Sequence, residues 1–304
     1  MVIIRTPLRI PIAGGGTDLP SYYTKFGSTF ISAAINQYIY TTYHRSKFDS
    51  KIRLRYSRME ELEHIDDIKN EIIRETLREH NIRDNVELTS HAEIPSGTGL
   101  GSSGSFGVGI LHAIYPDATK EFLARESTRI QMDVLKYPVG VQDQYAAAYG
   151  GANVYKVDKN GLVEVEPINV SGLADKLLLF FTGIKRDANE VLAKSTAKGL
   201  DKIQWLAFET REVLEAGNYH RYGEILSEHW EYKKKRGGMT DKNIDIWYNI
   251  GIKNGAIGGK LVGAGGGGFL LFYTEDKARL VNAMPLQYIP FKFESGGSKV
   301  ILND

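Results

Sequence analysis

The order of apolar and polar residues along the chain predicts a mixture of strands and helices. Apolar residues alternate loosely with polar ones over 2–12, and residues 29–45 and 51–57 also have strand-like patterns. Residues 59–80 have the spacing of a charged amphipathic helix. Residues 86–94 alternate cleanly, which predicts a strand with one face exposed to water, in an antiparallel or mixed sheet.

A segment rich in glycine and serine follows residue 94 and leads into a predicted helix over 104–115. Beyond it the pattern predicts helices over 119–135 and 139–148, a hairpin over 153–168, a strand over 176–181, helices over 187–198, 200–216, 219–235 and 240–255, two strands around a glycine loop within 258–273, a short helix after Thr274, and a last strand over 288–294. Strands and helices do not alternate strictly, so the expected class is α+β. We expect two domains, over 1–170 and 171–304, because a chain of 304 residues usually exceeds one core.

Composition narrows the class of protein without identifying its chemistry. The net charge is +1 and no tract is biased, so nothing indicates a nucleic acid or a membrane surface as partner. The chain contains no cysteine, which excludes disulfides, thiolate catalysis and cysteine-ligated zinc. No apolar run reaches the roughly 18 residues of a membrane span, and Arg5 and Arg9 interrupt the apolar N-terminus, unlike a secretory signal. We expect a cytoplasmic protein.

The segment from Pro95 to Gly107 contains five glycines and four serines directly before a predicted helix. Glycine costs roughly 0.5–1 kcal/mol in regular structure, so such a run indicates a specific role. A glycine-rich turn that leads into a helix N-terminus can cradle an anion, since that helix end carries partial positive charge and unpaired N–H groups. A tight connection without a ligand is the alternative.

Two common phosphate-binding patterns fit this segment poorly. The sequence has no G-x-x-x-x-G-K-[ST] loop. Gly99, Gly101 and Gly104 match the dinucleotide pattern G-x-G-x-x-G, which would indicate a nucleotide-sugar oxidoreductase. However, a dinucleotide-binding strand is buried on both faces and lies in the first β–α unit, whereas residues 86–94 alternate and come later. The oxidoreductase is a minor alternative.

The segment PSGTGLGSSGS, residues 95–105, resembles the P-x-x-x-G-L-G-S-S motif of the GHMP kinases, the superfamily of galactokinase, homoserine kinase, mevalonate kinase and phosphomevalonate kinase. The resemblance implies ATP as the phosphate donor and a two-domain α+β fold, with an N-terminal domain like domain 2 of ribosomal protein S5 and a C-terminal ferredoxin-like α/β sandwich. It also implies that Ser103 helps to bind Mg²⁺. The residues implied in nucleotide binding are Pro95, Gly97, Gly99, Leu100, Gly101, Ser102, Ser103, Gly104 and Ser105.

Two further segments resemble motifs of the same family. RTPLRIPIAGGGTDLPSYY, at 5–23, is similar to the first motif, which implies that Arg9 lies near the transferred phosphoryl group and that Asp18 accepts hydrogen bonds from substrate hydroxyls. From position alone, Thr17 or Asp18 is the N-cap of a helix. LVGAGGGGFLLFY, at 261–273, resembles the third motif, a loop that closes over the acceptor. The substrate-binding residues implied by the two segments are Gly16, Thr17, Asp18, Gly265 and Gly266.

The segment PVGVQDQYAAAYGG, residues 138–151, is similar to the one that carries the catalytic aspartate of sugar kinases in this superfamily, which implies Asp143 as the catalytic residue beside Arg9. A carboxylate early in a helix and near an arginine is held in its charged form. It can then accept the proton of a sugar hydroxyl that attacks the γ-phosphorus of ATP. An aspartate that only complements a helix dipole is the alternative.

One position departs from the family pattern. The second magnesium ligand is usually a glutamate seven residues before the proline of this last segment, and counting back from Pro138 gives Gln131. A neutral amide is a poorer ligand than a carboxylate for this hard cation. Three outcomes stay open: Gln131 binds the metal through water, Asp133 or Glu126 replaces it, or activity is low.

These segments, together with FFTGIKRDA at 180–188, are most similar to the branch of the family that phosphorylates D-glycero-D-manno-heptose 7-phosphate at its anomeric hydroxyl. A sugar phosphate is therefore the expected substrate, with ATP and Mg²⁺ as cofactors and a homodimer among the open oligomeric states. Lys185, Arg186 and the KKKR run at 233–236 are candidates for holding the substrate's phosphate, although such a run usually forms a solvated helix face. Two other functions stay open: a fucokinase- or galactokinase-like enzyme for an unphosphorylated sugar, and a kinase-like binding protein without turnover.

Overall fold

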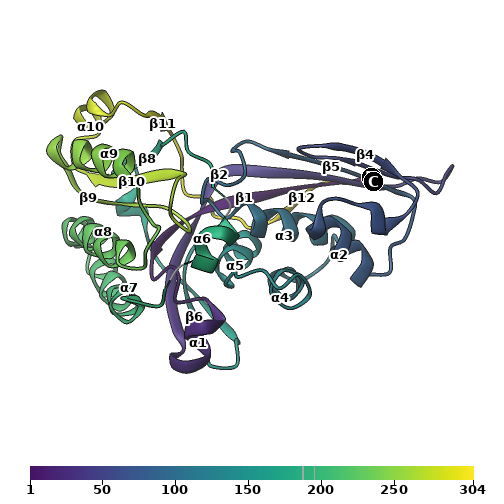
Figure 1. The fold of residues 1–304 in the computed structure, drawn as a ribbon, viewed down its shortest axis with the longest axis horizontal. Coiled ribbons are helices and arrows are strands. Elements are labelled where there is room, and N and C mark those ends of the chain that lie inside the picture. The colour runs from purple at the N-terminus through teal and green to yellow at the C-terminus, as the bar shows by residue number, and fades with distance from the viewer. Residues whose placement is uncertain (187, 195) are drawn as a thin grey trace.

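The computed structural model describes residues 1–186, 188–194 and 196–304, which form two β-sheets with helices packed against them. Two long strands, β1 (Val2–Ala13) and β2 (Ser28–Arg45), run along the molecule (Figure 1). Their sheet also contains β3 (Ile52–Arg55), β4 (Met59–Leu62), β5 (Val86–Ala92), β6 (Ala152–Val157), β7 (Val163–Pro167) and β12 (Lys299–Asn303). The order is β12–β1–β2–β5–β3–β4, with β6 paired to β2 and β7 to β6.

Helices cover one face of this eight-stranded sheet (Figure 1). They are α2 (Glu71–Glu79), α3 (Ser102–Ile114), α4 (Lys120–Arg129) and α5 (Gln142–Tyr149). Helices α3 and α5 pack directly on β1 and β2, and α4 packs on α3 and α5. Val108 and Leu111 of α3 are fully buried in the same cluster as Phe30 of β2. This packing fixes the N-terminus of α3 beside the first turn of α5.

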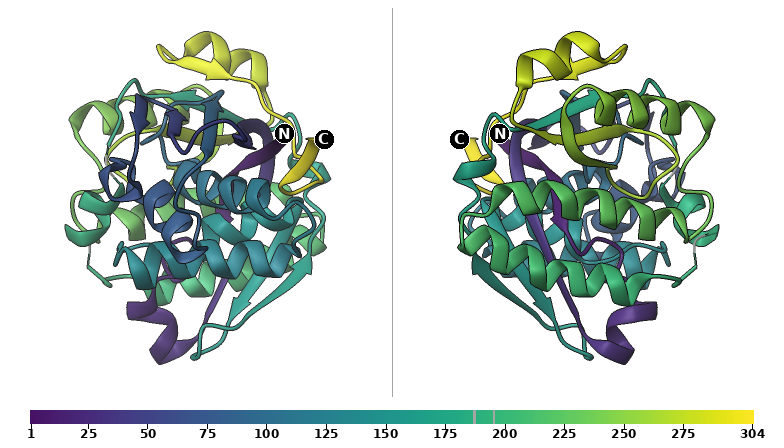
Figure 2. Two further views of the ribbon diagram at one scale, coloured as in Figure 1. Left: turned by 90° about the vertical axis from the view of Figure 1, so that its right-hand side faces the viewer. Right: turned by 90° about the vertical axis from the view of Figure 1, so that its left-hand side faces the viewer.

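The second sheet is antiparallel and has the order β11–β8–β10–β9. Its strands are β8 (Leu177–Phe181), β9 (Ala256–Leu261), β10 (Phe269–Thr274) and β11 (Gln287–Ile289). The helices of this half are α6 (Ala188–Lys194), α7 (Leu200–Glu215), α8 (Tyr219–Lys234), α9 (Lys242–Lys253) and α10 (Lys277–Ala283). Helices α7 and α8 lie side by side (Figure 2), α8 packs on β9, and α7 also contacts β1 and β2. Helix α7 thereby joins the two halves.

An antiparallel or mixed sheet is expected around residues 86–94, and the sheet is mixed, because β5 runs antiparallel to β2 and parallel to β3. The predicted helix over 59–80 is wrong in its first half. Met59–Leu62 form β4, which pairs with β3, and α2 begins only at Glu71. The physical reason is local capping: the side chain of Asn70 accepts a hydrogen bond from the Ile73 N–H and so starts the helix there.

The C-terminal segment also differs from the prediction. The strand predicted over 288–294 ends at Ile289, before Pro290, whose ring nitrogen cannot donate to a ladder. The chain then returns to the first sheet, where β12 pairs with β1 and the Met1 amino group donates to the carbonyl oxygen of Asp304 at 2.9 Å. The expected domain boundary between residues 170 and 171 stays a prediction. The last strand, β12, lies in the expected C-terminal domain by sequence but pairs with β1 in the first sheet.

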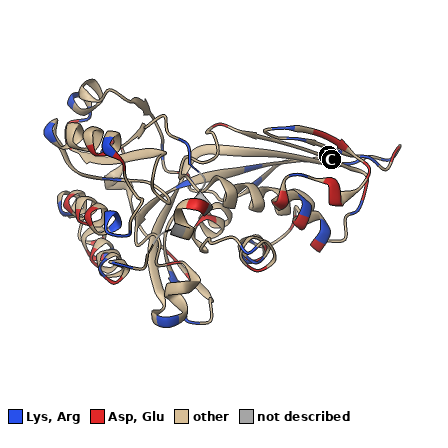
Figure 3. Ribbon diagram, viewed as in Figure 1, with Lys and Arg blue, Asp and Glu red and all other residues tan. Residues whose placement is uncertain are grey.

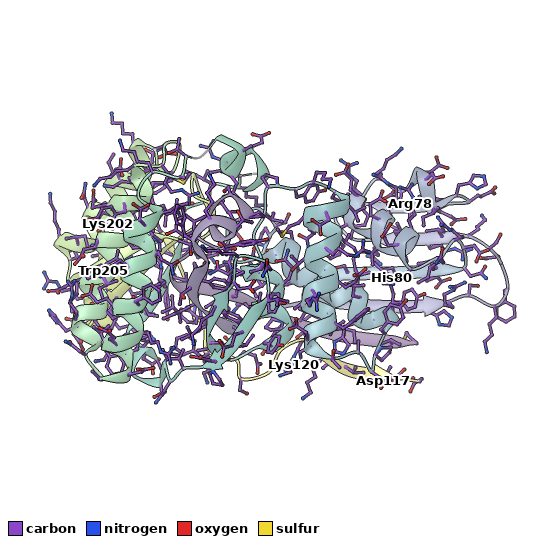
Figure 4. The ribbon with its side chains drawn as sticks, turned by 90° about the horizontal axis from the view of Figure 1, so that it is seen from below. Arg78, His80, Asp117, Lys120, Lys202 and Trp205 are labelled. Carbon is purple, nitrogen blue, oxygen red and sulfur yellow. The ribbon has the colours of Figure 1, made fainter. Side chains whose placement is uncertain are left out.

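Helices α2 and α7 lie at opposite ends of the molecule (Figure 4). Arg78 and His80 mark the first end, Lys202 and Trp205 the second, and Lys120 at the start of α4 lies between them. Residues 187 and 195 of the helix predicted over 187–198 lie outside the described residues. Within the described ranges, no helix combines the length and the apolar character that a membrane crossing requires.

Candidate active site

A cleft of about 1010 Å³ lies between the two halves of the molecule. We call its lining residues up to Asp143 the N-terminal wall and those from Lys185 to Ala264 the C-terminal wall. The predicted site residues that line the cleft are Arg9, Gly16, Asp18, Pro95, Gly97, Gly99, Gly101, Ser102, Ser103 and Asp143. The predicted residues Thr17, Leu100, Gly104, Ser105, Gly265 and Gly266 do not line it.

Arg9 and Asp143 form a direct ion pair in the cleft, although 134 residues separate them in the sequence. Arg9 lies on β1 and is 4% exposed, and Asp143 lies in the first turn of α5. The guanidinium donates from Nε and Nη2 to Asp143 Oδ1, at 2.8 and 2.5 Å, and from Nη1 to the carbonyl oxygen of Gly99 at 2.7 Å. One arginine thus holds both the carboxylate and the glycine loop.

The glycine-rich loop leads into α3 as predicted. Gly101, the N-cap, has a left-handed conformation with φ of 79°, which glycine adopts without strain. Ser102 and Ser103 are the first residues of the helix and line the cleft, and the Ser102 hydroxyl is buried with no hydrogen-bond partner among the described residues. The N–H groups of the first helical turn therefore face the cleft with partial positive charge, an arrangement that binds phosphate.

Three predicted residues that do not line the cleft support this loop from behind. A methyl group on Gly104 would lie 2.5 Å from Cβ of Asp143, so α3 and α5 can approach this closely only with glycine there. The Ser105 hydroxyl donates to the carbonyl oxygen of Pro7 at 2.8 Å, and the Leu100 carbonyl accepts from the Arg9 N–H at 3.0 Å. These contacts hold the loop in place, and a direct contact of these residues with a nucleotide stays a prediction.

Asp18 is buried and faces the cleft, and it does not cap α1 (Pro20–Phe26) as its position suggested. Its Oδ1 accepts from the Gly16 N–H at 2.9 Å, and its Oδ2 accepts from the Gln142 N–H at 3.2 Å. Burial raises the pKa of Asp18, and the charge of Asp143 raises it further. Asp18 therefore contacts the start of α5 instead of capping α1. The N-cap of α1 is Leu19, whose side chain makes no capping hydrogen bond.

Thr17 and Gly266 make hydrogen bonds behind the cleft surface, and a substrate contact by Thr17, Gly265 or Gly266 stays a prediction. The Thr17 hydroxyl contacts the Gly14 carbonyl and the Ser28 hydroxyl, both at 2.7 Å, in the protein interior. The Gly266 carbonyl oxygen accepts from Nε of Arg186 at 2.7 Å, while the Arg186 N–H donates to Gly97 at 3.1 Å. The cleft itself is lined by Gly263 and Ala264 of this loop.

The KKKR run at 233–236 divides between interior and surface. Lys233 and Arg236 are buried and line the cleft. Lys234 forms an ion pair with Glu231 at 2.6 Å, and Lys235 is exposed. The run therefore forms part of the cleft wall and part of the solvated face of α8. Charged residues of both signs also lie on the outer helices α2, α7 and α8 (Figure 3).

Sequence reasoning missed His229, Lys260 and Gly140, which also line the cleft. His229 lies four residues before Lys233, on the same buried face of α8, and this spacing was a signal available in the sequence. Lys260 interrupts an apolar strand and is 1% exposed. A methyl group on Gly140 would lie 1.9 Å from Asp18 Oδ2, a conflict that only the folded chain reveals.

None of the three residues considered as the second magnesium ligand lines the cleft. Gln131 is fully buried, donates to the Ser127 hydroxyl at 3.2 Å, and lies next to Gly107 on α3. Glu126 pairs with Arg129 and His80, and these hydrogen bonds lower its pKa to about 2. Asp133 is exposed. Among the described residues, the carboxylates that line the cleft are those of Asp18 and Asp143.

The cleft and the fold have the features expected of a phosphotransferase: a glycine loop at a helix N-terminus and a carboxylate–arginine pair beside it. Two family profiles match, the GHMP kinases N-terminal domain over residues 67–151 and the GHMP kinases C-terminal domain over 210–289. The chain belongs to the GHMP kinase family. The predicted family, its two-domain α+β fold and a kinase activity are thereby confirmed.

Known relatives agree with this assignment. The chain is 29% identical to D-glycero-alpha-D-manno-heptose 7-phosphate kinase of Campylobacter jejuni over 92% of each sequence. It resembles the crystal structure of a D-glycero-D-manno-heptose 1-phosphate kinase from Bacteroides thetaiotaomicron, with a TM-score of 0.81, 25% identity and full coverage of both chains. A putative sugar kinase from Campylobacter jejuni gives a TM-score of 0.76 at 27% identity, over 98% of this chain and 97% of that one.

Proposed function

We propose that this protein is an ATP-dependent kinase that phosphorylates the anomeric hydroxyl of D-glycero-D-manno-heptose 7-phosphate to give the 1,7-bisphosphate. The observation that carries the proposal is the Arg9–Asp143 pair, which lies beside the glycine loop at the start of α3 within one cleft. The names of the relatives that align over nearly the whole chain support a heptose phosphate as acceptor.

In this mechanism Asp143 accepts the proton of the anomeric hydroxyl while that oxygen attacks the γ-phosphorus of ATP. The new O–P bond forms as the bond to the β-phosphate oxygen breaks, and ADP leaves with that electron pair. Arg9 keeps the carboxylate oriented through Oδ1 and adds positive charge near the transferred group. Asp143 Oδ2, which accepts no hydrogen bond from the described residues, faces the acceptor. Proton acceptance of this kind contributes about 10²–10⁴ in rate.

The nucleotide and the sugar would occupy different parts of the N-terminal wall. The segment 97–103 would hold the triphosphate through backbone N–H groups and the two serine hydroxyls. Asp18 and Gly16 would contact the sugar, with Thr17, Gly265 and Gly266 as the support behind this surface. Asp18 accepts hydroxyl donors as a carboxylate and can donate one hydrogen bond when protonated.

The residues present fit a magnesium ion that the nucleotide brings with it. Mg²⁺ in kinases usually keeps several waters and is held by one or two protein oxygens together with phosphates. Ser103 would hold the ion, and the orphaned Ser102 hydroxyl adds a second oxygen at the same helix end. Among the described residues no group of three acidic or histidine side chains forms a separate metal site. When bound, the ion would neutralise charge on the phosphoryl oxygens.

The cytoplasm remains our proposed location, on the sequence evidence given above, and small molecules are the proposed partners. The oligomeric state, for which a homodimer is one option, is decided by light scattering of the purified protein at two concentrations.

The function is tested by ADP release with Mg-ATP and four acceptors: D-glycero-D-manno-heptose 7-phosphate, the unphosphorylated heptose, L-fucose and D-galactose. Phosphorus NMR of the product then identifies the new phosphate. We expect fastest turnover with the 7-phosphate and an anomeric phosphate in the product. A fifth acceptor, heptose 1-phosphate, is included because the Bacteroides protein is named for that compound. Faster turnover with L-fucose or D-galactose, or no ADP release with any acceptor, would overturn the proposal.

A further inference from the structure

The C-terminal wall of the cleft carries a group of buried basic side chains that the proposed reaction has not used. His229 and Lys233 lie on α8, Lys260 lies on β9, and Arg236 follows the end of α8. All four line the cleft that contains Arg9 and Asp143. Burying so many basic groups together is costly unless opposite charge is present, since buried charges in proteins are normally paired.

The two lysines are held by neutral oxygen atoms instead of carboxylates. Lys233 Nζ donates to the carbonyl oxygens of Leu261 and Gly263, at 2.8 and 2.5 Å. Lys260 Nζ donates to the carbonyl oxygen of Ile12 at 2.8 Å and lies 3.3 Å from His229 Nδ1. No acidic group of the described residues lies within ion-pair distance of either amine. A charged lysine has three N–H donors, so both side chains keep donor capacity toward the cleft.

The carboxylates of the cleft are already matched with arginines. Asp143 forms an ion pair with Arg9. The charge of Asp18 raises the pKa of Arg236 against the lowering effect of burial. Burial, followed by repulsion from Arg9, lowers the pKa of Lys260 to about 7, and burial with repulsion from its basic neighbours also lowers the pKa of Lys233. Lys233 and Lys260 therefore give the C-terminal wall a surplus of up to two positive charges that no carboxylate of the described residues neutralises.

We infer that Lys233, Lys260 and His229 form a subsite for a phosphomonoester dianion, the phosphate that the sugar acceptor already carries. This inference rests on the proposed function and assigns residues to the recognition of that acceptor. A phosphomonoester carries a charge of about −1.5 to −2 at neutral pH, which matches the surplus. His229 completes the subsite: when Nδ1 accepts from Lys260, the ring proton is on Nε2, which can donate to a phosphate oxygen.

The position of the group favours the acceptor's phosphate over the phosphates of ATP. Lys260 is bonded to Ile12, on the stretch of chain that runs from Arg9 toward Asp18. Arg236 lies against Gly16, where a methyl group would be 2.4 Å from its Nη1. The subsite thus adjoins the segment proposed to contact the sugar. Lys233 is also hydrogen-bonded to Gly263, which packs on Gly99 of the loop proposed for ATP, so the phosphates of ATP are the competing occupant that the test must distinguish.

Calorimetric binding without ATP tests the subsite with a matched pair of ligands, D-glycero-D-manno-heptose 7-phosphate and the unphosphorylated heptose. We expect the wild-type protein to bind the 7-phosphate at least about a hundredfold more tightly. Lys233→Met and Lys260→Met should each reduce that ratio by about tenfold or more, as expected when one charged hydrogen bond is lost. Lys235→Met, an exposed neighbour in the same basic run, should leave the ratio unchanged.

Several outcomes would overturn the inference. Equal affinity of the wild-type protein for both ligands does so without any variant, and therefore decides the matter even if a variant fails to fold. An affinity ratio that is unchanged in both lysine variants would also overturn the inference. Weaker binding of an ATP analogue in those variants would show that the lysines bind the phosphates of ATP instead. The proposed function can fail separately from the subsite. Selective binding of the 7-phosphate without phosphoryl transfer from Mg-ATP would support the subsite and contradict the kinase function. Phosphoryl transfer without selective binding would support the kinase function and contradict the subsite.

Discussion

On the N-terminal wall of the cleft, Arg9 donates two hydrogen bonds to Asp143 and a third to the glycine loop. On the C-terminal wall, Lys233 and Lys260 donate to backbone carbonyls and to a histidine. The N-terminal wall contains Arg9 together with the carboxylates of Asp18 and Asp143, whereas the C-terminal wall contains basic side chains and, among the described residues, no carboxylate. The first wall is organised before any ligand arrives, and the second is complete only when an anion occupies it.

This difference separates two tasks of a kinase. Catalysis requires that the groups around the transferred phosphoryl be positioned in advance, because reorganisation during the reaction adds to the barrier. Selection of an acceptor can instead use charges that are unfavourable in the empty site, since the correct ligand removes that penalty and a neutral ligand does not. The predictions below test each wall in turn, from the largest expected effect to the smallest.

Substitution of the carboxylate on the N-terminal wall is expected to have the largest effect. Asp143→Asn removes the proton acceptor and should lower kcat by about 10²–10⁴. Steady-state ADP release measures this. Asp133→Asn, an exposed position on the neighbouring segment, is the matched control and should retain activity. An Asp143→Asn enzyme with full kcat would remove Asp143 from the mechanism.

A methyl group behind that carboxylate should act through position alone. Gly104→Ala would place its Cβ 2.5 Å from Asp143 Cβ and force α3 and α5 apart. A displacement near 1 Å can cost about 10² in rate, so we expect kcat to fall by about 10–10². In the control Gly15→Ala the nearest atom would be 3.7 Å away, and kcat should change little. Equal kcat in the two variants would show that the contact is not critical.

The pH dependence of acceptor binding tests the C-terminal wall. Lys260, which faces Arg9 and His229, has its pKa lowered to about 7 in the empty site, so it loses its charge as the pH rises above 7. For the sugar phosphate, kcat/KM should therefore fall above pH 7, by at most about tenfold per pH unit. Lys260→Met should start lower and lack this decline. A wild-type profile that stays flat to pH 9 would contradict the assignment.

The same lysine should make the empty protein more stable at alkaline pH. Its pKa is lower in the folded state than the value of 10.5 expected in the unfolded chain, so the unfolded state binds more protons between pH 7 and 10.5. Linkage then raises the free energy of unfolding with pH in that window, by up to about 1.4 kcal/mol per unit. Urea unfolding at pH 7 and 9 should show a smaller rise in Lys260→Met. Equal rises would mean that Lys260 is charged in the folded protein.

Local patterns were sufficient to predict most elements and one wall of the site. Clean alternation predicted β5 in an antiparallel or mixed sheet, and the glycine–serine run predicted the loop before α3. These signals depend on residues adjacent in sequence, such as glycines at positive φ before a helix. The motif resemblance also pointed to Arg9 and Asp143, whose contact the structure then displays. The helix over 59–80 failed because one cap, Asn70, decided where α2 begins.

The sequence by itself was sufficient for the class of fold, the kinase family and several residues of the N-terminal wall, because these follow from short motifs and from the family they resemble. Only the tertiary structure decided which members of the KKKR run face the cleft, that Lys260 joins Lys233 and His229 there, and that Asp18 contacts the start of α5 rather than capping α1. The physical reason is that burial and charge balance depend on atoms brought together from distant parts of the chain. The sequence alone does not show whether a lysine side chain is solvated or buried beside another cation.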